Sequence, residues 1–484
     1  MTKYFFRFSL LFILAACQGN TSPQFRVHPA NAKIIPSAET FYSEVLPSLS
    51  GKKVMLVTNP SGIGNLPSKI ISEFAKHNVR LEHLIGLEHG FLGIEEEFSQ
   101  TPVTLDPVFS RPLYHIYKVK DSELRDLASE VDVVLFDVQD VGMRCYTYVS
   151  VLKRLLDAIQ NTKTEMVLLD HIHVAMHLPP MGEKMDPKHT NFAGEFPSLL
   201  ISGMTLGESA KFYAKEFLKD KVNLKIIPVK GYSRDQYFEE TGLVWYTPSP
   251  NLPMVETARN YLALVMLEGV NVSVGRGTQA PFVYFGAPWM TEPSELANKL
   301  STLGNKAYFF STVYFKPTFG PHKGKICHGL RMNLVRADYD PIELSYELIR
   351  LMKEVYPKDF RWNKGGQNYW ADQLWGNDHF RNAINEGKSY LEFHKSYLKL
   401  EEDEKNKIIW ECKKWWGDNC LYLQSDVRKQ FYSCIYLAAG FQEYVRDSRE
   451  KNDVSIINEK WEEFNSLRNL IENSVQLSPI KYKD

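Results

Sequence analysis

The chain has 484 residues, of which 44% are hydrophobic and 24% charged, and its formal net charge is −1. This length predicts more than one domain, the composition is that of a folded globular protein, and the near-neutral charge argues against a nucleic-acid partner. The six cysteines form no CxxC pair, so we expect neither a disulfide scaffold nor a structural zinc site.

The first 17 residues have the pattern of a bacterial lipoprotein signal peptide. Lys3 and Arg7 flank the start of an apolar run, residues 8–14, that is too short to span a bilayer. The run ends in Leu-Ala-Ala-Cys at residues 14–17, which resembles a lipobox. We therefore expect lipidation at Cys17, a polar tether over residues 18–40, and a cell-envelope protein that is lipid-anchored in the membrane and faces the periplasm or the outer membrane.

Residues 41–288 alternate between short apolar runs and amphipathic stretches. The apolar runs suit strands buried on both faces, and they are expected at Val54–Thr58, Leu81–Gly86, Val131–Asp137 and Met166–Asp170. Helical patterns occur at Pro67–His77, Tyr148–Ile159 and Leu206–Leu218. Strands and helices that alternate at this spacing predict an α/β fold, a Rossmann-like domain with a parallel sheet.

A smaller α+β auxiliary domain is expected over residues 289–404. Its sequence predicts helices at Ser294–Leu303 and Ile342–Val355, and strands at Ala307–Phe315 and Ile326–Val335. Residues 405–484 are rich in aromatic and charged residues, and they predict a helical C-terminal tail whose role the sequence does not indicate.

Polar side chains follow three of the predicted strands directly. In chain order these side chains are Glu88, His89, Asp137, Gln139, Asp140, Arg144, Asp170 and His171. Ligands of open parallel sheets bind beyond the carboxyl ends of the strands, because the loops from strand to helix converge there. The sequence therefore predicts a polar crevice at this edge of the sheet.

Five motifs then point to a known family. They are Glu-His-Gly at residues 88–90, Asp-Val-Gln-Asp-Val-Gly-Met-Arg-Cys-Tyr-Thr-Tyr at 137–148, Gly-Met-Thr-Leu-Gly-Glu at 203–208, Pro-Ser-Pro-Asn-Leu-Pro at 248–253 and Gly-Arg-Gly-Thr at 275–278. In this order they resemble the motifs of the exo-β-N-acetylmuramidase (NamZ-like) glycosidase family, formerly a domain of unknown function. The resemblance covers about residues 50–400. It implies a Rossmann-like domain with a smaller auxiliary domain, and release of N-acetylmuramic acid from the non-reducing ends of peptidoglycan fragments without a cofactor.

Glycoside hydrolysis needs a proton on the leaving oxygen and stabilisation of an oxocarbenium-like transition state. The resemblance implies that Glu88 is the catalytic acid/base. Asp137 and Asp140 are the candidates for a second catalytic carboxylate. Such a carboxylate would either activate water or hold the 2-acetamido group of the sugar, and the sequence favours neither route.

The substrate itself suggests further residues. N-acetylmuramic acid carries a lactyl carboxylate, which an arginine side chain can bind through two parallel hydrogen bonds. The candidates are Arg144 and Arg276, which both lie within motifs and close to glycines. Other expected substrate-binding residues are His89, Gln139, Tyr146, Asn251 and Thr278. Tyr146, Tyr148 and Trp245 are candidates for stacking on sugar rings, although core packing is an equal alternative for each.

The chain departs from the family pattern at three places. Residues 171–174 replace an Arg-Pro-Asn-Pro run, Val274 replaces an acid before the Gly-Arg-Gly-Thr motif, and Glu95–Glu97 replace small residues. These changes leave a rival open, a non-catalytic envelope lipoprotein that binds cell-wall sugar or a protein partner. A dinucleotide enzyme is disfavoured because residues 59–64 lack GxGxxG, and a metal hydrolase because no compact set of ligands such as HExxH is present.

Overall fold

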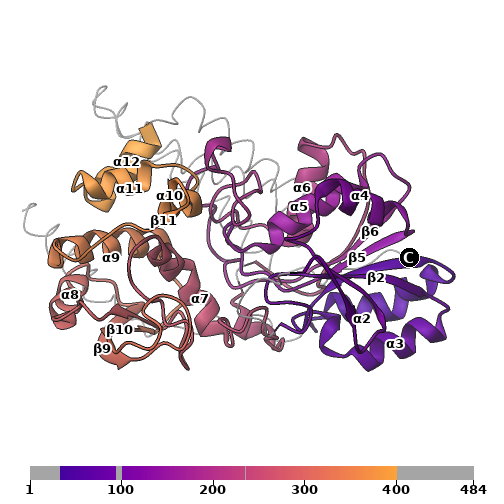
Figure 1. The fold of residues 1–484 in the computed structure, drawn as a ribbon, viewed down its shortest axis with the longest axis horizontal. Coiled ribbons are helices and arrows are strands. Elements are labelled where there is room, and N and C mark those ends of the chain that lie inside the picture. Colours follow the sequence, from indigo (N-terminus) through magenta and orange to yellow (C-terminus); the bar gives the residue numbers. More distant parts are fainter. Residues whose placement is uncertain (1–32, 94–100, 235, 400–484) are drawn as a thin grey trace, which may run out of the picture.

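The computed structural model describes residues 33–93, 101–234 and 236–399, which form two lobes (Figure 1). The larger lobe is built on a seven-stranded sheet. Its strands are β1 (Lys53–Thr58), β2 (Arg80–Gly86), β3 (Val103–Asp106), β4 (Arg111–His115), β5 (Val133–Asp137), β6 (Glu165–Leu169) and β7 (Asn223–Ile227).

The strand order of this sheet is β3-β4-β2-β1-β5-β6-β7. Neighbours pair in parallel, except that β3 is antiparallel to β4. Without the antiparallel edge strand β3, the remaining strands follow the order 3-2-1-4-5-6 of the Rossmann fold. The order reverses between β1 and β5, so a crevice is expected beyond the carboxyl ends of these two strands.

Helices cover both faces of the sheet. In β1, Val54 and Leu56 belong to the apolar cluster that contains α3, whereas Met55 and Val57 belong to the cluster that contains α4 and α5. Because both faces are buried, the central strands β1, β5 and β6 are apolar over most of their length and do not alternate with polar residues. The covering helices are α2 (Ser37–Thr40), α3 (Pro67–Lys76), α4 (Asp121–Ser129), α5 (Tyr148–Ile159) and α6 (Leu206–Glu216).

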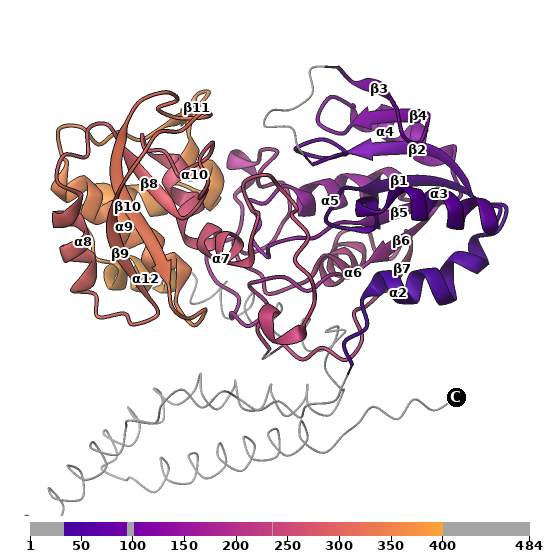
Figure 2. The same cartoon turned by 90° about the horizontal axis from the view of Figure 1, so that it is seen from below.

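The smaller lobe contains a three-stranded antiparallel sheet of order β8-β10-β9. Helix α7 lies between the lobes (Figures 1 and 2) and packs on α9, and one hydrophobic cluster runs through both lobes. The elements are α7 (Val255–Leu264), the 3₁₀ helix η6 (Val265–Gly269), β8 (Tyr284–Ala287), α8 (Pro293–Ser301), β9 (Tyr308–Phe315), β10 (Cys327–Leu334), α9 (Pro341–Val355), β11 (Lys364–Gly365), β12 (Asn368–Tyr369), α10 (Trp370–Trp375), α11 (His379–Asn385) and α12 (Tyr390–Lys399).

The predicted fold class is confirmed, a Rossmann-like parallel sheet joined to a smaller α+β unit. The predicted strands coincide with β1, β2, β5, β6, β9 and β10 within two residues at each end, and the predicted helices with α3, α5, α6, α8 and α9. The sequence did not predict the edge strand β7, which alternates between exposed and partly buried residues. It also missed the helix α7, whose residues from Thr257 to Leu264 are all buried.

Two predicted boundaries differ from the observed packing. Strand β8 precedes the predicted domain boundary at residue 288, yet it pairs with β10 of the smaller lobe. Ile35 bridges Lys230 and α2 begins at Ser37, so the packed body starts inside the stretch predicted as a tether. The predicted signal peptide with Cys17 and the predicted tail over residues 405–484 lie outside the described residues.

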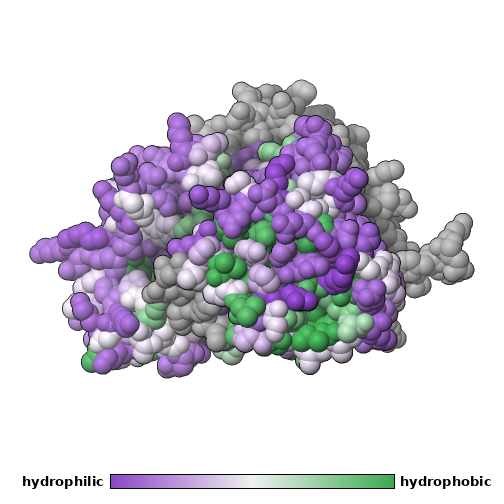
Figure 3. Space-filling view, turned by 45° about the vertical axis from the view of Figure 1, so that its right-hand side comes forward, coloured by the Kyte–Doolittle hydropathy of each residue, from purple (hydrophilic) through white to green (hydrophobic). Residues whose placement is uncertain are grey.

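The surface seen in Figure 3 is largely hydrophilic, with smaller hydrophobic areas between the polar side chains. In the described part of the chain, no helix has both the length and the apolar character that a membrane span requires.

Candidate active site

A cavity of about 130 Å³ lies where the loops after β2 and β5 meet the smaller lobe. The lining comes from both lobes, since α10 contributes Trp370 and Leu374 from the C-terminal part of the chain. Polar and charged side chains share the lining with aromatic ones. The residues are Glu88, His89, Cys145, Tyr146, Thr147, Phe192, Ala193, Ser249, Asn251, Leu252, Tyr261, Val265, Glu268, Arg276, Phe282, Trp370 and Leu374.

Glu88 is positioned by the turn that follows β2. His89 has a left-handed backbone (φ 69°) and so does Gly90 (φ 75°), which reverses the chain directly after the strand. The Thr147 hydroxyl, from the loop after β5, donates to Glu88 Oε2 at 2.7 Å. His89 Nε2 lies 4.0 Å from Glu88 Oε1 and 3.0 Å from Ser249 Oγ. The Glu88 side chain keeps 25% of its surface exposed, so it is accessible from the cavity.

Glu268 is a cavity carboxylate that the sequence reasoning missed. It lies on η6, eight residues before Arg276, and its Oε1 accepts a hydrogen bond from Arg276 Nε at 2.7 Å. Burial lowers the pKa of Arg276, but the charges of Glu268 and Glu88 outweigh it and raise that pKa. The arginine therefore lies in the field of both glutamates. The signal in the sequence was only its position shortly before the Gly-Arg-Gly-Thr motif.

The loop that carries Arg276 is fixed by its glycines. Gly275 (φ 78°) and Gly277 (φ 73°) are both left-handed, and a Cβ there would lie 2.7 Å from the Tyr284 carbonyl oxygen and 2.4 Å from the Phe319 nitrogen. These glycines are therefore required because the turn packs closely against the protein's own backbone. Neither Nη atom of Arg276 has a hydrogen-bond partner among the described residues, and 22% of the side chain is exposed.

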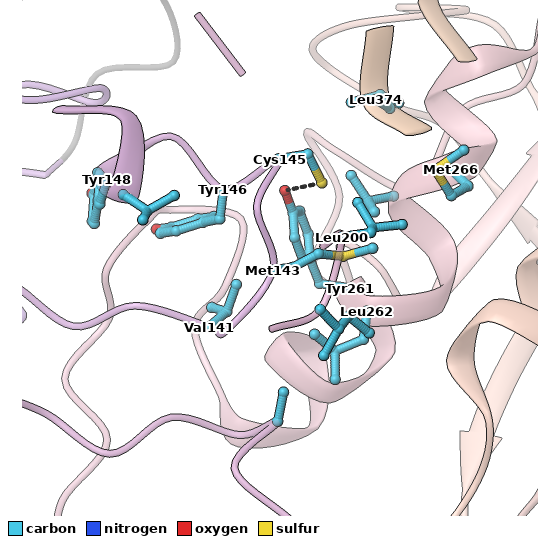
Figure 4. Packing of buried hydrophobic residues seen from close by; sticks show 14 of the residues in the cluster. Val141, Met143, Cys145, Tyr146, Tyr148, Leu200, Tyr261, Leu262, Met266 and Leu374 are labelled. Atoms are coloured by element: carbon cyan, nitrogen blue, oxygen red, sulfur yellow. Dashed lines mark hydrogen bonds between the residues drawn. The ribbon is translucent and has the colours of Figure 1, made fainter. Parts of the chain in front are cut away.

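Aromatic and apolar side chains form one wall of the cavity (Figure 4). Tyr146 contacts Tyr261 edge to face, and the Cys145 thiol lies 3.8 Å from the Tyr261 hydroxyl. Burial raises the pKa of Cys145 to about 12, so this thiol is protonated at neutral pH and is no nucleophile. Asn251 is 3% exposed, and its Nδ2 has no hydrogen-bond partner among the described residues. An unpaired buried amide of this kind is costly unless a ligand satisfies it.

The two aspartates predicted as second carboxylates lie behind the cavity and are absent from its lining. Asp137 is completely buried, where Oδ2 accepts from the Ile63 amide at 2.6 Å and Oδ1 lies 2.5 Å from His171 Nε2. Burial lowers the pKa of His171, but the Asp137 carboxylate raises it more, so the net pKa is raised. The substituted residue His171 thereby holds the carboxylate of a motif aspartate.

Asp140 has a different buried setting. Its Oδ1 accepts from the Gly142 amide at 2.6 Å, and its Oδ2 has no partner among the described residues. Burial raises the pKa of Asp140 to about 7, against the opposing effect of the amides of Gly142 and Val141. Gly142 itself is required because a Cβ there would lie 2.2 Å from the His173 ring.

Gln139, Thr278 and Arg144 were also predicted to bind substrate, and they too lie outside the lining. Gln139 Nε2 donates to the carbonyls of Asp140 and Ile172, both at 2.7 Å. Thr278 Oγ1 donates to the Gly275 carbonyl at 2.6 Å, inside its own turn. The structure therefore brings Glu88, His89, Tyr146, Asn251 and Arg276 together, and it places Asp137, Asp140, Gln139, Arg144 and Thr278 around them.

Arg144 joins the two lobes from a buried position. It is 2% exposed, and its Nη1 donates to the carbonyls of Glu183 and Ser198 at 2.7 and 2.8 Å. Its Nη2 donates to the carbonyls of Leu374 and Trp375 of α10. Its Nε has no partner among the described residues, but the side chain is buried and absent from the cavity lining, so a substrate in the cavity does not reach it. Arg276 is the arginine that lines the cavity.

Among the described residues, no group of three or more His, Cys, Asp or Glu side chains is placed to hold a metal ion.

Comparisons with known proteins agree with the motifs. The family description "Exo-beta-N-acetylmuramidase NamZ, N-terminal" matches residues 54–256, and its C-terminal counterpart matches residues 259–408. Peptidoglycan beta-N-acetylmuramidase NamZ of Bacillus subtilis (strain 168) is 31% identical over 370 residues, which cover 75% of this chain and 88% of the relative.

Two crystal structures of DUF1343 family proteins from Bacteroides fragilis NCTC 9343 share the fold. One has a TM-score of 0.67 at 24% identity and covers 81% of this chain and 100% of its own. The other has a TM-score of 0.59 at 25% identity and covers 79% and 98%. The family matches together span most of the chain and confirm the resemblance seen in the motifs. This chain therefore belongs to the exo-β-N-acetylmuramidase NamZ family.

Proposed function

We propose that this chain is an exo-acting glycoside hydrolase that releases N-acetylmuramic acid from the non-reducing ends of peptidoglycan fragments. Membership of the family and the similarity to the Bacillus subtilis relative support this function. The observation that carries it is the grouping of the Glu88 carboxyl with Glu268 and Arg276 in one cavity. A glycosidase needs a proton donor and a source of negative charge on the two sides of the scissile bond.

Glu88 is the group that we assign to proton transfer. The Thr147 hydroxyl donates a hydrogen bond to Glu88 Oε2, so we assign the contact with the leaving oxygen to Oε1. As the bond between the anomeric carbon and the leaving oxygen breaks, protonated Glu88 gives its proton to that oxygen. The resulting carboxylate then accepts a proton from the water that completes hydrolysis.

Glu268 replaces Asp137 and Asp140 as the second carboxylate in this mechanism, because it lines the cavity and they do not. Its negative charge would stabilise the oxocarbenium-like transition state or activate water. The hydrogen bond from Arg276 fixes the direction of the Glu268 carboxyl group. A substrate-assisted route, in which Glu268 orients the 2-acetamido group, uses the same placement.

Arg276 supplies the recognition that distinguishes N-acetylmuramic acid from N-acetylglucosamine. Its Nε donates to Glu268, while its two Nη atoms have no hydrogen-bond partner among the described residues and are the donors that we assign to a ligand in the cavity. A lactyl carboxylate fits such a donor pair. The buried Asn251 amide provides a further donor for a sugar hydroxyl or acetamido oxygen.

The test is hydrolysis of a disaccharide with N-acetylmuramic acid at its non-reducing end, with the released sugar measured by mass spectrometry. We expect turnover by the wild type and a loss of about 10²–10⁴-fold in Glu88→Gln, because the amide donates no proton. Glutamine keeps an acceptor for Thr147, so the melting temperature should be unchanged. Glu123→Gln, on the exposed side of α4, is the matched control. Binding without turnover in the wild type would instead support the non-catalytic sugar-binding protein.

We also propose that the enzyme is held at the cell envelope by a lipid on Cys17. The support is the sequence of residues 1–17, in which a short charged and apolar leader ends at a lipobox-like cysteine. Such a tether would keep the cavity close to the peptidoglycan from which its substrates come.

A further inference from the structure

The cavity has an aromatic pair at its most exposed point. Phe192 is 42% exposed, more than any other residue of the lining, and it comes from the loop region between β6 and α6. Trp370 opens α10 of the smaller lobe. Their ring centroids are 6.0 Å apart with an interplanar angle of 30°, which is a stacked arrangement. Figures 1 and 2 both show α10 on the side of the smaller lobe that faces the large sheet.

The structure holds this pair in place from both lobes. Asn191, the residue before Phe192, donates through Nδ2 to the carbonyls of His189 and of Gln373 on α10. Its Oδ1 accepts from the Ala193 amide at 2.8 Å, which fixes the backbone on both sides of Phe192. Tyr117 meets the Phe192 ring edge to face. The exposed ring is therefore held rigidly, and little side-chain entropy would be lost when a ligand binds to it.

The lining combines charged groups with an aromatic surface. Glu88, Glu268 and Arg276 supply charge, and each side chain is 20–25% exposed. The aromatic pair supplies a flat, apolar and more open surface. An exo-acting enzyme places the terminal sugar against the charged groups, and the rest of the substrate must leave through the open side.

We propose that Phe192 and Trp370 form the binding site for the leaving sugar, the N-acetylglucosamine-type hexosamine linked to the terminal N-acetylmuramic acid. The inference rests on the proposed function. A pyranose ring presents an apolar face of C–H groups, which packs on an aromatic ring by dispersion and desolvation. The sequence had pointed to Tyr146, Tyr148 and Trp245 for stacking. Tyr146 lines the cavity, but it is buried and its ring packs against Tyr148 and Tyr261. Tyr148 is completely buried, and Trp245 is absent from the cavity lining.

Two substrates separate this site from the catalytic groups. One is the disaccharide of N-acetylmuramic acid and N-acetylglucosamine, and the other is N-acetylmuramyl β-fluoride, which has no second ring. In Phe192→Ala and Trp370→Ala we expect kcat/KM for the disaccharide to fall about 3- to 10-fold, chiefly through KM. For the fluoride, kcat/KM should stay within about two-fold of the wild type. Phe192→Tyr should restore the disaccharide value. Phe309→Ala, an exposed phenylalanine on β9 outside the lining, is the control.

Binding measurements make the result independent of turnover. In the Glu88→Gln protein, the disaccharide should bind more tightly than free N-acetylmuramic acid, and Phe192→Ala should abolish the difference. If the wild type cleaves neither substrate but this difference is present, the proposed reaction fails while the sugar site stands. Equal losses of kcat/KM on both substrates in the aromatic variants would overturn the assignment of the aromatic pair. So would unchanged kcat/KM on both substrates together with equal affinities of the Glu88→Gln protein for the disaccharide and for N-acetylmuramic acid.

Discussion

Glu268 and Asp140 show how strongly the surroundings of a single carboxyl group decide its role. Glu268 lines the cavity and is paired with an arginine, so a ligand in the cavity can reach it. Asp140 lies in the most distinctive motif, yet its carboxyl is buried, and burial raises its pKa to about 7. Only the first of these residues is placed to act on a substrate.

Replacing Glu268 tests the second carboxylate. We expect Glu268→Gln to lower kcat on the disaccharide by about 10²–10⁴-fold, since the amide carries no charge to stabilise the transition state or to activate water. The affinity of the Glu88→Gln, Glu268→Gln double variant for the disaccharide, measured by calorimetry, should be close to that of the Glu88→Gln single variant. Unchanged kcat in Glu268→Gln would remove this residue from the mechanism.

Asp140→Asn should retain activity and change the pH dependence of stability. Because the pKa of the folded-state carboxyl is raised from 3.8 to about 7, the folded protein keeps a proton that the unfolded chain releases. The free energy of unfolding should therefore fall as the pH rises from about 4 to about 7. The asparagine variant lacks this contribution and should be more stable by roughly 1–3 kcal/mol at pH 8.

Urea denaturation at pH 4.5 and pH 8 measures this effect. The stability gained by Asp140→Asn at pH 8 should shrink at pH 4.5, where the wild-type carboxyl is protonated in the folded state. An equal difference at both pH values would show that the carboxyl is ionised throughout this range.

At the scale of elements, the loops that carry the two motif arginines give them different roles. The loop after β5 directs Arg144 against backbone carbonyls of α10 and of the segment around Glu183, which ties the lobes together. The turn built from Gly275 and Gly277 directs Arg276 into the cavity beside Glu268. A motif residue close to glycines can therefore serve either architecture or recognition.

Changing each arginine to methionine separates these roles. Arg276→Met should lower the affinity for fragments ending in N-acetylmuramic acid by about 10- to 150-fold. This is the loss of one charge-assisted pair of roughly 1.5–3 kcal/mol. Fragments ending in N-acetylglucosamine should be little affected. Arg144→Met should lower the free energy of unfolding by at least about 2 kcal/mol, because it leaves buried carbonyls without donors. Calorimetric titration and chemical denaturation give both values. The reverse pattern would assign carboxylate recognition to Arg144.

At the scale of the whole molecule, the cavity depends on the joining of the lobes. Glu88 and Thr147 come from the large sheet, Glu268 and Arg276 from the segment after α7, and Trp370 from α10. The hydrophobic cluster that runs through both lobes, together with the contacts of Arg144, holds these groups in one arrangement. A rigid cavity of this kind suits a terminal sugar, because its charged groups are fixed before binding.

The attachment of the molecule to the envelope is tested at Cys17. In a bacterial host, we expect the wild type to incorporate a labelled fatty acid and to sediment with membranes. Cys17→Ala should remain unlabelled and uncleaved at the signal peptide, because the thiol that accepts the lipid is missing. Activity of the purified body on the disaccharide should be the same for both proteins. A wild type without label would exclude the anchor.

The sequence by itself determined the fold class, and its motifs singled out Glu88 as the candidate proton donor. Apolar runs bounded by helical periodicity identified β1, β2, β5 and β6, because strands buried on both faces must be apolar throughout. Glu88 was found because it directly follows a strand and lies in a short motif, both of which are local properties. The edge strand β7 was not predicted, because its exposed residues interrupt any continuous apolar run.

Only the tertiary structure decided which polar residues meet. Arg144 donates to the Leu374 carbonyl, which lies 230 residues further along the chain. This arginine was expected to bind a ligand, and in the structure it connects the two lobes. Glu268, Phe192 and Trp370 carry no motif of their own, and they meet Glu88 only because the smaller lobe packs on the carboxyl ends of the sheet. Local spacing fixes which side of a strand or helix a residue occupies, whereas a cavity is set by long-range packing that one segment of sequence does not encode.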